Sequence, residues 1–143
     1  MESNPIRSFR DLDAWNIAMS LALACYGVAK RLPADERFEL SAQIRRAAVS
    51  VPSNVAEGHS SGRDGVFGRH VSISLGSVGE LETHMELVVR TGLLPRTDVQ
   101  TVLEQLTRTG QVLQGLARSI RARRLKRAGG VSAALLVALL VGS

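Results

Sequence analysis

The sequence predicts an all-α protein, an up-down-up-down bundle of four helices. In four segments, apolar residues recur at alternating spacings of three and four, which places them on one face of a helix. No segment alternates convincingly with the period of two that strands require. Apolar residues make up 45% of the chain and aromatic residues only 3%, which suits a core of aliphatic side chains. Four such helices with short connections form a bundle.

The first two helices are expected at residues 11–31 and 35–58. The stripe of the first consists of Leu12, Trp15, Met19, Ala22, Tyr26 and Ala29, and that of the second of Leu40, Ile44, Ala47, Val51 and Val55. Pro33 ends the first helix, because a proline pushes the residue before it out of the α region. Pro52 lies inside the second, where it removes a backbone hydrogen bond at a cost of about 3 kcal/mol. The stripe keeps its phase across Pro52, so we expect a kink there rather than a break near Ser50.

The third and fourth helices are expected at residues 64–91 and 97–125. Their stripes are Phe67, Val71, Ser74, Val78, Leu81, Met85 and Val88, and Val99, Leu103, Leu106, Gly110, Leu113, Ala117 and Ile120. Three glycines of the third helix are expected to let a neighbouring helix approach closely: Gly68, Gly76 and Gly79. Gly92 and Pro95 mark its end, and a capping-box pattern from Thr97 to Gln100 begins the fourth. Residues 1–127 then form the bundle domain and residues 128–143 an apolar C-terminal tail.

The charge of the chain is concentrated in one place. The net charge is +5, yet residues 1–117 are almost neutral. The basic segment, residues 118–127, carries six cations and no acid: Arg118, Arg121, Arg123, Arg124, Lys126 and Arg127. Such a block is typical of a contact with nucleic acid or another anionic surface. The alternative is a helix end whose cations only complement the helix dipole. No aromatic residue interrupts the segment, so stacking on bases is not expected.

An apolar run of eleven residues, 131–141, follows Gly129 and Gly130. A membrane-spanning helix needs about 20 apolar residues, so we expect this run to pack on the bundle or on a partner subunit, and a membrane partner is not favoured. Attachment to a membrane surface is the weaker alternative. The chain starts without an apolar leader and has a single cysteine, Cys25, which excludes an internal disulfide. A cytoplasmic protein is expected.

The sequence shows no catalytic or metal-binding motif. It lacks HExxH, CxxC, a P-loop and GxSxG. His70 and His84 lie about 21 Å apart along one helix and cannot share a metal ion within one chain. Neither has a glutamate three residues before it, as di-iron bundles require. The histidines are therefore expected at the surface or at helix ends, and no enzyme activity, metal or cofactor is expected.

A polar stripe runs beside the apolar one in the second helix. Arg46, Ser50, Ser53 and Glu57 follow a 4, 3, 4 spacing, with Asn54 at the border, and the third helix offers Ser77, Glu80 and His84. One interpretation is a polar seam between the two helices, with Arg46 or Arg45 paired to Glu80 or Glu57, that fixes register and partner choice. The alternative is a solvated face.

Three segments resemble a known bacterial family: FRDLDAW (9–15), LSAQIRRAAVSVPSNVAEGHSSG (40–62) and SLGSVGELETHMEL (74–87). They are similar to the four-helix bundles encoded in 23S rRNA intervening sequences and, further, to the accessory variability determinant of diversity-generating retroelements. The resemblance covers about residues 8–120. The residues that match its pattern are read as structural or assembly residues: Arg46, Ser50, Pro52, Asn54, Glu57, Gly58, Gly76, Ser77 and Glu80.

The resemblance implies a ring-like homopentamer without catalytic activity. In the retroelement branch it implies a basic ring that binds a reverse transcriptase and nucleic acid. We therefore expect an oligomeric binding module that contacts RNA or DNA through the basic segment. One role expected for it is that of an accessory factor to a reverse transcriptase. The alternatives are a protein–protein adaptor without nucleic-acid binding and, more weakly, peripheral membrane attachment through the tail.

Overall fold

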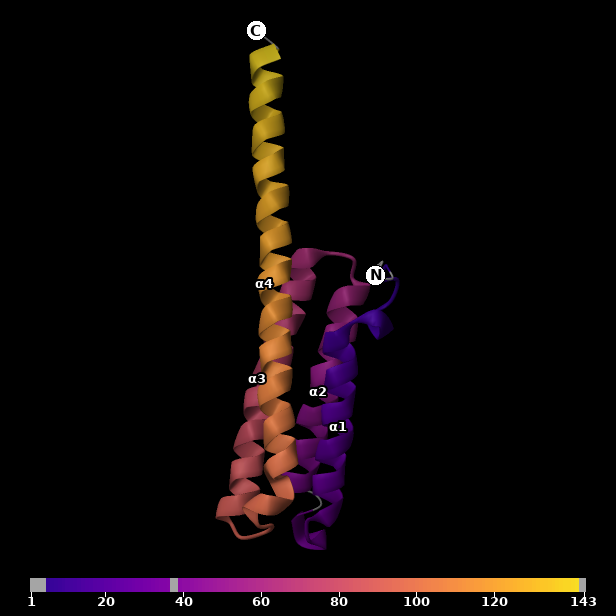
Figure 1. Ribbon diagram of the computed structural model, residues 1–143, viewed down its shortest axis with the longest axis vertical. Helices are drawn as coiled ribbons and strands as arrows, with labels where there is room; N and C mark the ends of the chain where they lie inside the picture. The colour runs from indigo at the N-terminus through magenta and orange to yellow at the C-terminus, as the bar shows by residue number, and fades with distance from the viewer. Residues whose placement is uncertain (1–4, 37–38, 142–143) are drawn as a thin grey trace.

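Four helices run alternately up and down in the computed structural model, which describes residues 5–36 and 39–141 (Figure 1). They are α1 (Asp13–Arg31), α2 (Leu40–Ser60), α3 (Asp64–Arg90) and α4 (Arg96–Val141), with short 3-10 turns η1 (Phe9–Asp11) and η2 (Ala34–Glu36). α1 and α3 each pack against both α2 and α4. The predicted all-α bundle is confirmed.

The apolar stripes of α2, α3 and α4 form most of the core. Every residue of the predicted α3 stripe is buried, as are Ile44, Ala47, Val51 and Val55 of α2. In α4, Leu106 and Leu113 are fully buried. The stripe predicted for the first helix was partly wrong, because α1 is apolar around most of its circumference. Its innermost residues are Ala14, Ala18, Leu21, Cys25 and Val28, while Trp15, Met19 and Tyr26 lie at its edge toward α2.

One proline ends a helix as predicted, and another lies inside one. α1 ends at Arg31, two residues before Pro33. α2 continues through the buried Pro52 without a break, and a bend at that point stays a prediction. α2 begins at Leu40 rather than near residue 35, because Ala34–Glu36 forms a separate 3-10 turn after Pro33.

α3 ends at a glycine, as predicted. Gly92 has φ +75°, a conformation that costs glycine little. The Leu93 N–H donates to the Val88 carbonyl at 3.0 Å and the Gly92 N–H donates to the Val89 carbonyl at 3.0 Å, which closes the end of α3. α4 begins at Arg96, so the predicted cap residue, Thr97, lies inside the helix rather than before it.

Gly58 of α2 lies in tight contact with α3. A Cβ atom there would lie 2.8 Å from Cβ of His70 and 2.9 Å from Cδ2 of Phe67, both on α3. The sequence had instead indicated the glycines of α3. A Cβ at Gly76 or Gly79 would meet no atom within 4 Å, and one at Gly68 would make only ordinary contact with Ile120. The tight contact therefore uses a glycine of the facing helix.

α4 is longer than α3 and extends beyond the bundle (Figure 1). Gly110 faces Val78 and Ile120 lies beside Gly68, so each step along α4 is matched by a step back along α3. α3 begins at Asp64, and α4 has no α3 partner beyond that level. The predicted helix end near residue 125 was wrong: α4 continues through Gly129 and Gly130 to Val141. Two glycines weaken a helix by up to about 1 kcal/mol each without ending it, and the Ala and Leu residues beyond them favour the helix.

Candidate nucleic-acid interface

The basic segment lies on α4 where this helix leaves the bundle. All ten residues from Arg118 to Arg127 belong to α4, and all except the buried Ile120 are exposed. One side of the segment faces the first turns of α3, which supply an acid, Asp64, and one further cation, Arg69. The sequence identified these cations, and the structure adds the neighbours that decide which of them carry uncompensated charge.

Asp64, in the first turn of α3, pairs with two of the six cations. The Arg123 Nη2 atom donates to Asp64 Oδ1 at 3.2 Å, and the Arg127 Nη1 atom lies 3.2 Å from Asp64 Oδ2. The Arg123 hydrogen bond and the surrounding arginines hold the pKa of Asp64 below its usual value. Asp64 is thus ionised at neutral pH and compensates part of the segment. Within the described chain, no ion pair engages Arg118, Arg121, Arg124 or Lys126.

Two of these remaining arginines line a hollow between α3 and α4. It measures about 290 Å³, and its rim carries Arg121 and Arg124 from α4 and Arg69 from α3. The rest of the lining consists of Gly65, Gly68, Ser72, Ala117 and Ile120. The Arg124 guanidinium lies over Gly65, where a Cβ would come within 3.9 Å of it. We refer to this site as the arginine hollow.

The arginine hollow has the chemistry of an oxyanion site. Three guanidinium groups present planar arrays of donors that match phosphate oxygens, and no acid lines the hollow. Sequence reasoning missed Arg69, because on α3 it is a single exposed cation. The antiparallel turn at Gly92 offered a signal, since it brings the start of α3 beside the basic segment of α4.

The predicted polar seam between α2 and α3 is present, with different partners. The Ser77 hydroxyl donates to Ser50 Oγ at 2.8 Å, and the Asn54 side-chain amide donates to the Ser50 carbonyl at 2.9 Å. Asn54 Oδ1 lies 2.9 Å from His70 Nδ1. The Ser74 hydroxyl adds a hydrogen bond to the Val51 carbonyl at 2.9 Å. The contacts Ser77–Ser50, His70–Asn54 and Ser74–Val51 cross between the two helices within one chain, so they contribute to the register of α2 on α3. A role in assembly stays a prediction.

Each acid of the seam lies near a histidine. Glu57 lies 3.9 Å from His70, and Glu80 lies 3.9 Å from His84. Arg46 is exposed on α2. Stripe spacing had suggested that Arg46 or Arg45 pairs with Glu80 or Glu57. No ion pair joins Arg46 to either acid in the described chain, because spacing alone does not place a long side chain across a helix interface, and the Arg45 alternative stays a prediction.

His84 contradicts the expectation that the histidines lie at the surface or at helix ends. It is buried on the inner face of α3, with 5% of its surface exposed. Burial lowers its pKa below the usual value, and the nearby Glu80 opposes that shift only in part. His84 is therefore neutral at pH 7 and behaves as a core residue.

The comparisons with known proteins agree with this architecture. The family model described as "23S rRNA-intervening sequence protein" matches residues 10–115. The chain belongs to this family. A crystal structure of a protein of unknown function from the S23 ribosomal protein family of Bacteroides thetaiotaomicron shares the fold, with a TM-score of 0.68 and 22% identity. The alignment covers 73% of this chain and 95% of that one. No curated protein sequence matches the chain.

The family match ends before the basic segment begins. Residues 10–115 include Arg69 and the whole polar seam, while the six cations of α4 and the apolar run lie beyond them. The family description names no enzymatic activity, and the similar structure is of a protein of unknown function.

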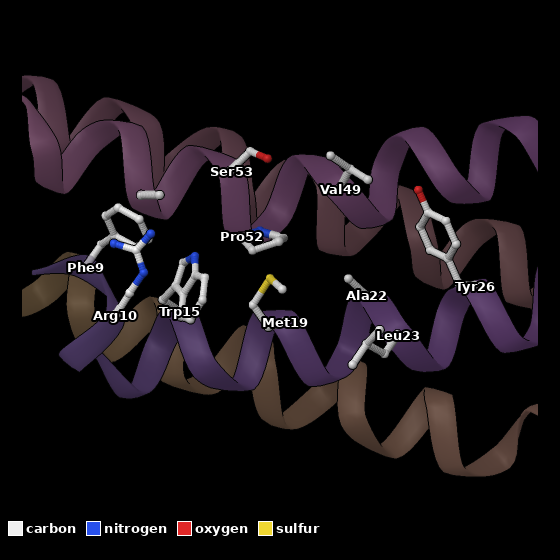
Figure 2. Close-up of a pocket in the computed structure, with 11 residues that line it drawn as sticks. Phe9, Arg10, Trp15, Met19, Ala22, Leu23, Tyr26, Val49, Pro52 and Ser53 are labelled. Carbon is white, nitrogen blue, oxygen red and sulfur yellow. The ribbon is translucent and has the colours of Figure 1, made fainter.

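A second feature of this family member is an apolar groove between α1 and α2 (Figure 2). It measures about 510 Å³, and its lining includes Phe9, Trp15, Met19, Leu23, Tyr26, Val49 and Pro52. Figure 2 shows Trp15, Met19 and Leu23 side by side along α1, with Pro52 and Val49 on the facing helix. Leu23 is 70% exposed and Val49 46% exposed. The groove is thus a surface of exposed apolar side chains.

The described residues offer neither a metal-binding cluster nor a membrane-spanning helix. In the part of the chain that the structure describes, no three His, Cys, Asp or Glu side chains gather as metal ligands would. None of the described helices has the length and apolarity to cross a membrane. Cys25 is fully buried, and burial raises the pKa of its thiol to about 12.

Proposed function

We propose that this protein is a non-enzymatic, homo-oligomeric module that binds the sugar–phosphate backbone of RNA or DNA through the basic segment and the arginine hollow. The observation that carries this proposal is the hollow, in which Arg69, Arg121 and Arg124 converge from two helices with no lining acid. Phosphate contacts of this kind supply affinity without reading sequence. The lack of aromatic residues in the hollow and the segment supports backbone binding over base recognition.

The test is fluorescence anisotropy with labelled single-stranded RNA and duplex DNA over a range of salt concentrations. The triple variant Arg69→Ala/Arg121→Ala/Arg124→Ala removes three cations from the hollow. Each lost phosphate contact is expected to reduce the slope of log K against log[salt] by about 0.7 for single strands and 0.9 for duplex DNA. The triple variant should therefore bind weakly and with a slope about 2 to 3 smaller.

A matched control removes the same charge elsewhere. Lys30, Arg90 and Arg108 are exposed cations away from the hollow, and their triple alanine variant should keep most of the affinity and the parental slope. Equal losses in both triple variants would reduce the effect to net charge. Parental affinity of the hollow variant would contradict the proposal.

Oligomerisation is supported by the apolar groove. Exposed apolar patches mark interaction sites on soluble proteins, and a contact between unlike surfaces of identical chains closes into a ring when the rotation permits. A ring would bring several basic segments together and multiply the charge. Size-exclusion chromatography with light scattering should show an oligomer for the parent and a smaller species for Leu23→Glu. Ser20→Glu, on another exposed part of α1, is the control and should leave the mass unchanged.

One further role extends this proposal, and a second candidate function stands as an alternative to it. As an accessory factor to a reverse transcriptase, the full chain should capture that enzyme in a pull-down, and capture that survives nuclease treatment would show direct contact. A protein–protein adaptor without nucleic-acid binding is the second candidate function, and the groove favours it. That candidate predicts partner capture lost in Leu23→Glu and unaffected by the triple variant of the hollow.

A further inference from the structure

The end of α4 is an apolar rod of helix whose described side chains are exposed. α4 carries the run 131–141 away from the bundle as a continuous helix (Figure 1). Among the described side chains of this run, Leu135 is 58% exposed, Val137 59% and Val141 81%. At 100° per residue, Leu135 and Val137 point to nearly opposite sides of the helix. The run is thus apolar around its axis rather than along one stripe.

The chemistry of the run sets it apart from a surface helix. From Ala128 to Ser143 the sequence contains no charged residue. A helix that is apolar on all sides is found in a protein core or in a membrane. A groove on a second copy of the chain would cover only one side of such a helix. Lipid covers every side.

The basic segment directly precedes the run on the same helix. Its cations are all exposed, and Arg118, Arg121, Arg124 and Lys126 have no ion-pair partner in the described chain. Clusters of four to eight Lys and Arg beside an apolar helix attract anionic lipid headgroups. The order along the rod, cations first and apolar residues beyond them, matches the order of phosphates and acyl chains at a bilayer surface.

The dimensions fit a single leaflet. Eleven helical residues are about 16 Å long, and the hydrocarbon core of a bilayer is about 30 Å thick. The run therefore reaches about the midplane when the basic segment lies at headgroup level. Long arginine and lysine side chains can extend along the helix to keep their charges among the phosphates.

We propose that the end of α4 anchors the protein peripherally to an anionic phospholipid membrane, with the apolar run in one leaflet and the basic segment at the lipid phosphates. This inference goes beyond the proposed function and does not rest on it, because the apolar run takes no part in the arginine hollow. The end of the bundle that carries the start of α3 then faces the lipid headgroups, because Arg123 and Arg127 of the basic segment pair with Asp64 in the first turn of α3.

The test is flotation of the full chain with vesicles of phosphatidylcholine, with and without phosphatidylglycerol. The parent is expected to float with the anionic vesicles. The variant Leu135→Asp/Val137→Asp places two carboxylates in the run and should lower vesicle partitioning by about a hundredfold or more. Ile73→Asp/Leu87→Asp is the matched control, since these α3 residues are 45% and 44% exposed and lie on the bundle. It should partition like the parent.

Other outcomes would overturn the proposal. A parent that stays with the protein fraction when anionic vesicles float contradicts it. If vesicle binding survives Leu135→Asp/Val137→Asp, the contact is electrostatic adhesion of the basic segment alone and insertion is refuted. If the parent does not float and this variant changes the oligomer mass in the absence of lipid, the run is a contact with a second copy.

One further measurement separates this proposal from nucleic-acid binding, and another tests insertion directly. Leu135→Asp/Val137→Asp should keep the parental affinity for RNA, so the two proposals can fail independently. Leu135→Trp in a Trp15→Phe background reports depth: its emission should shift to shorter wavelength and be quenched by brominated lipid in anionic vesicles. Emission that does not change when such vesicles are added contradicts insertion.

Discussion

The two halves of α4 are one continuous helix in two different environments. In the half that packs on α1 and α3, Leu106 and Leu113 are fully buried, and Ile120 is 1% exposed. Beyond the bundle, Leu125 and Leu135 are 68% and 58% exposed. The same residue type therefore stabilises the fold in one half and is available to a partner in the other. Along α4, the exposure of leucine therefore follows from the length of the helix, because α4 continues beyond the level at which α3 begins.

The largest expected effect is a leucine truncation in the packed half. Leu113→Ala leaves a cavity in the core and should lower the free energy of unfolding by about 2–5 kcal/mol. Leu135→Ala in the free half should change it by less than about 0.5 kcal/mol, because no core contact is lost. Urea denaturation followed by circular dichroism measures both. Similar losses in the two variants would mean that the free half packs on the bundle in solution.

A pair of glycine substitutions sharpens the same comparison. Gly58→Ala should destabilise the protein by about 1–3 kcal/mol, because its Cβ meets backbone-attached atoms of α3 that cannot move aside easily. Gly129→Ala meets nothing within 4 Å and replaces a poor helix former by the best one, a gain of up to about 1 kcal/mol for the local helix. Thermal melting should give a lower Tm for Gly58→Ala. Circular dichroism should show unchanged or higher helicity for Gly129→Ala.

The smallest expected effect is a dependence of the stability on pH, which arises from a residue buried in the bundle. The pKa of His84 is lowered in the folded protein because burial disfavours the imidazolium. As the pH falls below about 6.5, the unfolded chain binds a proton at this residue while the folded chain does not, so unfolding becomes easier until the pH reaches the lower, folded pKa. The urea concentration at the midpoint of unfolding should therefore decrease as the pH is lowered from 7.5 to 5.5.

His84→Leu should flatten that dependence, and a chain ending at Arg127 should retain it. His59→Gln is the control at a partly exposed position. If the parent and His84→Leu lose the same stability over this pH range, another group is responsible.

Most of the bundle could be predicted from the sequence, because a repeat at helical spacing reports directly which face is buried. Val71, Leu81 and Met85 of α3 are examples. The glycine at position 92 marked the end of that helix, and the structure shows it there with a positive φ. The prediction failed for Trp15 and Met19, since α1 is apolar on more than one side and spacing does not say which side meets the core. The expectation for His84 failed for a similar reason: a single polar residue carries no periodic signal of its own.

The sequence by itself determined the four helices, the concentration of charge at 118–127 and the apolar character of 131–141, because each is a local property of consecutive residues. The tertiary structure alone placed Gly58 in tight contact with α3 and brought Ser50 and Asn54 to Ser77 and His70. It also decided that Arg69 joins Arg121 and Arg124. These outcomes depend on the register of one helix against another. That register is set by the sum of many contacts between distant residues rather than by any one segment.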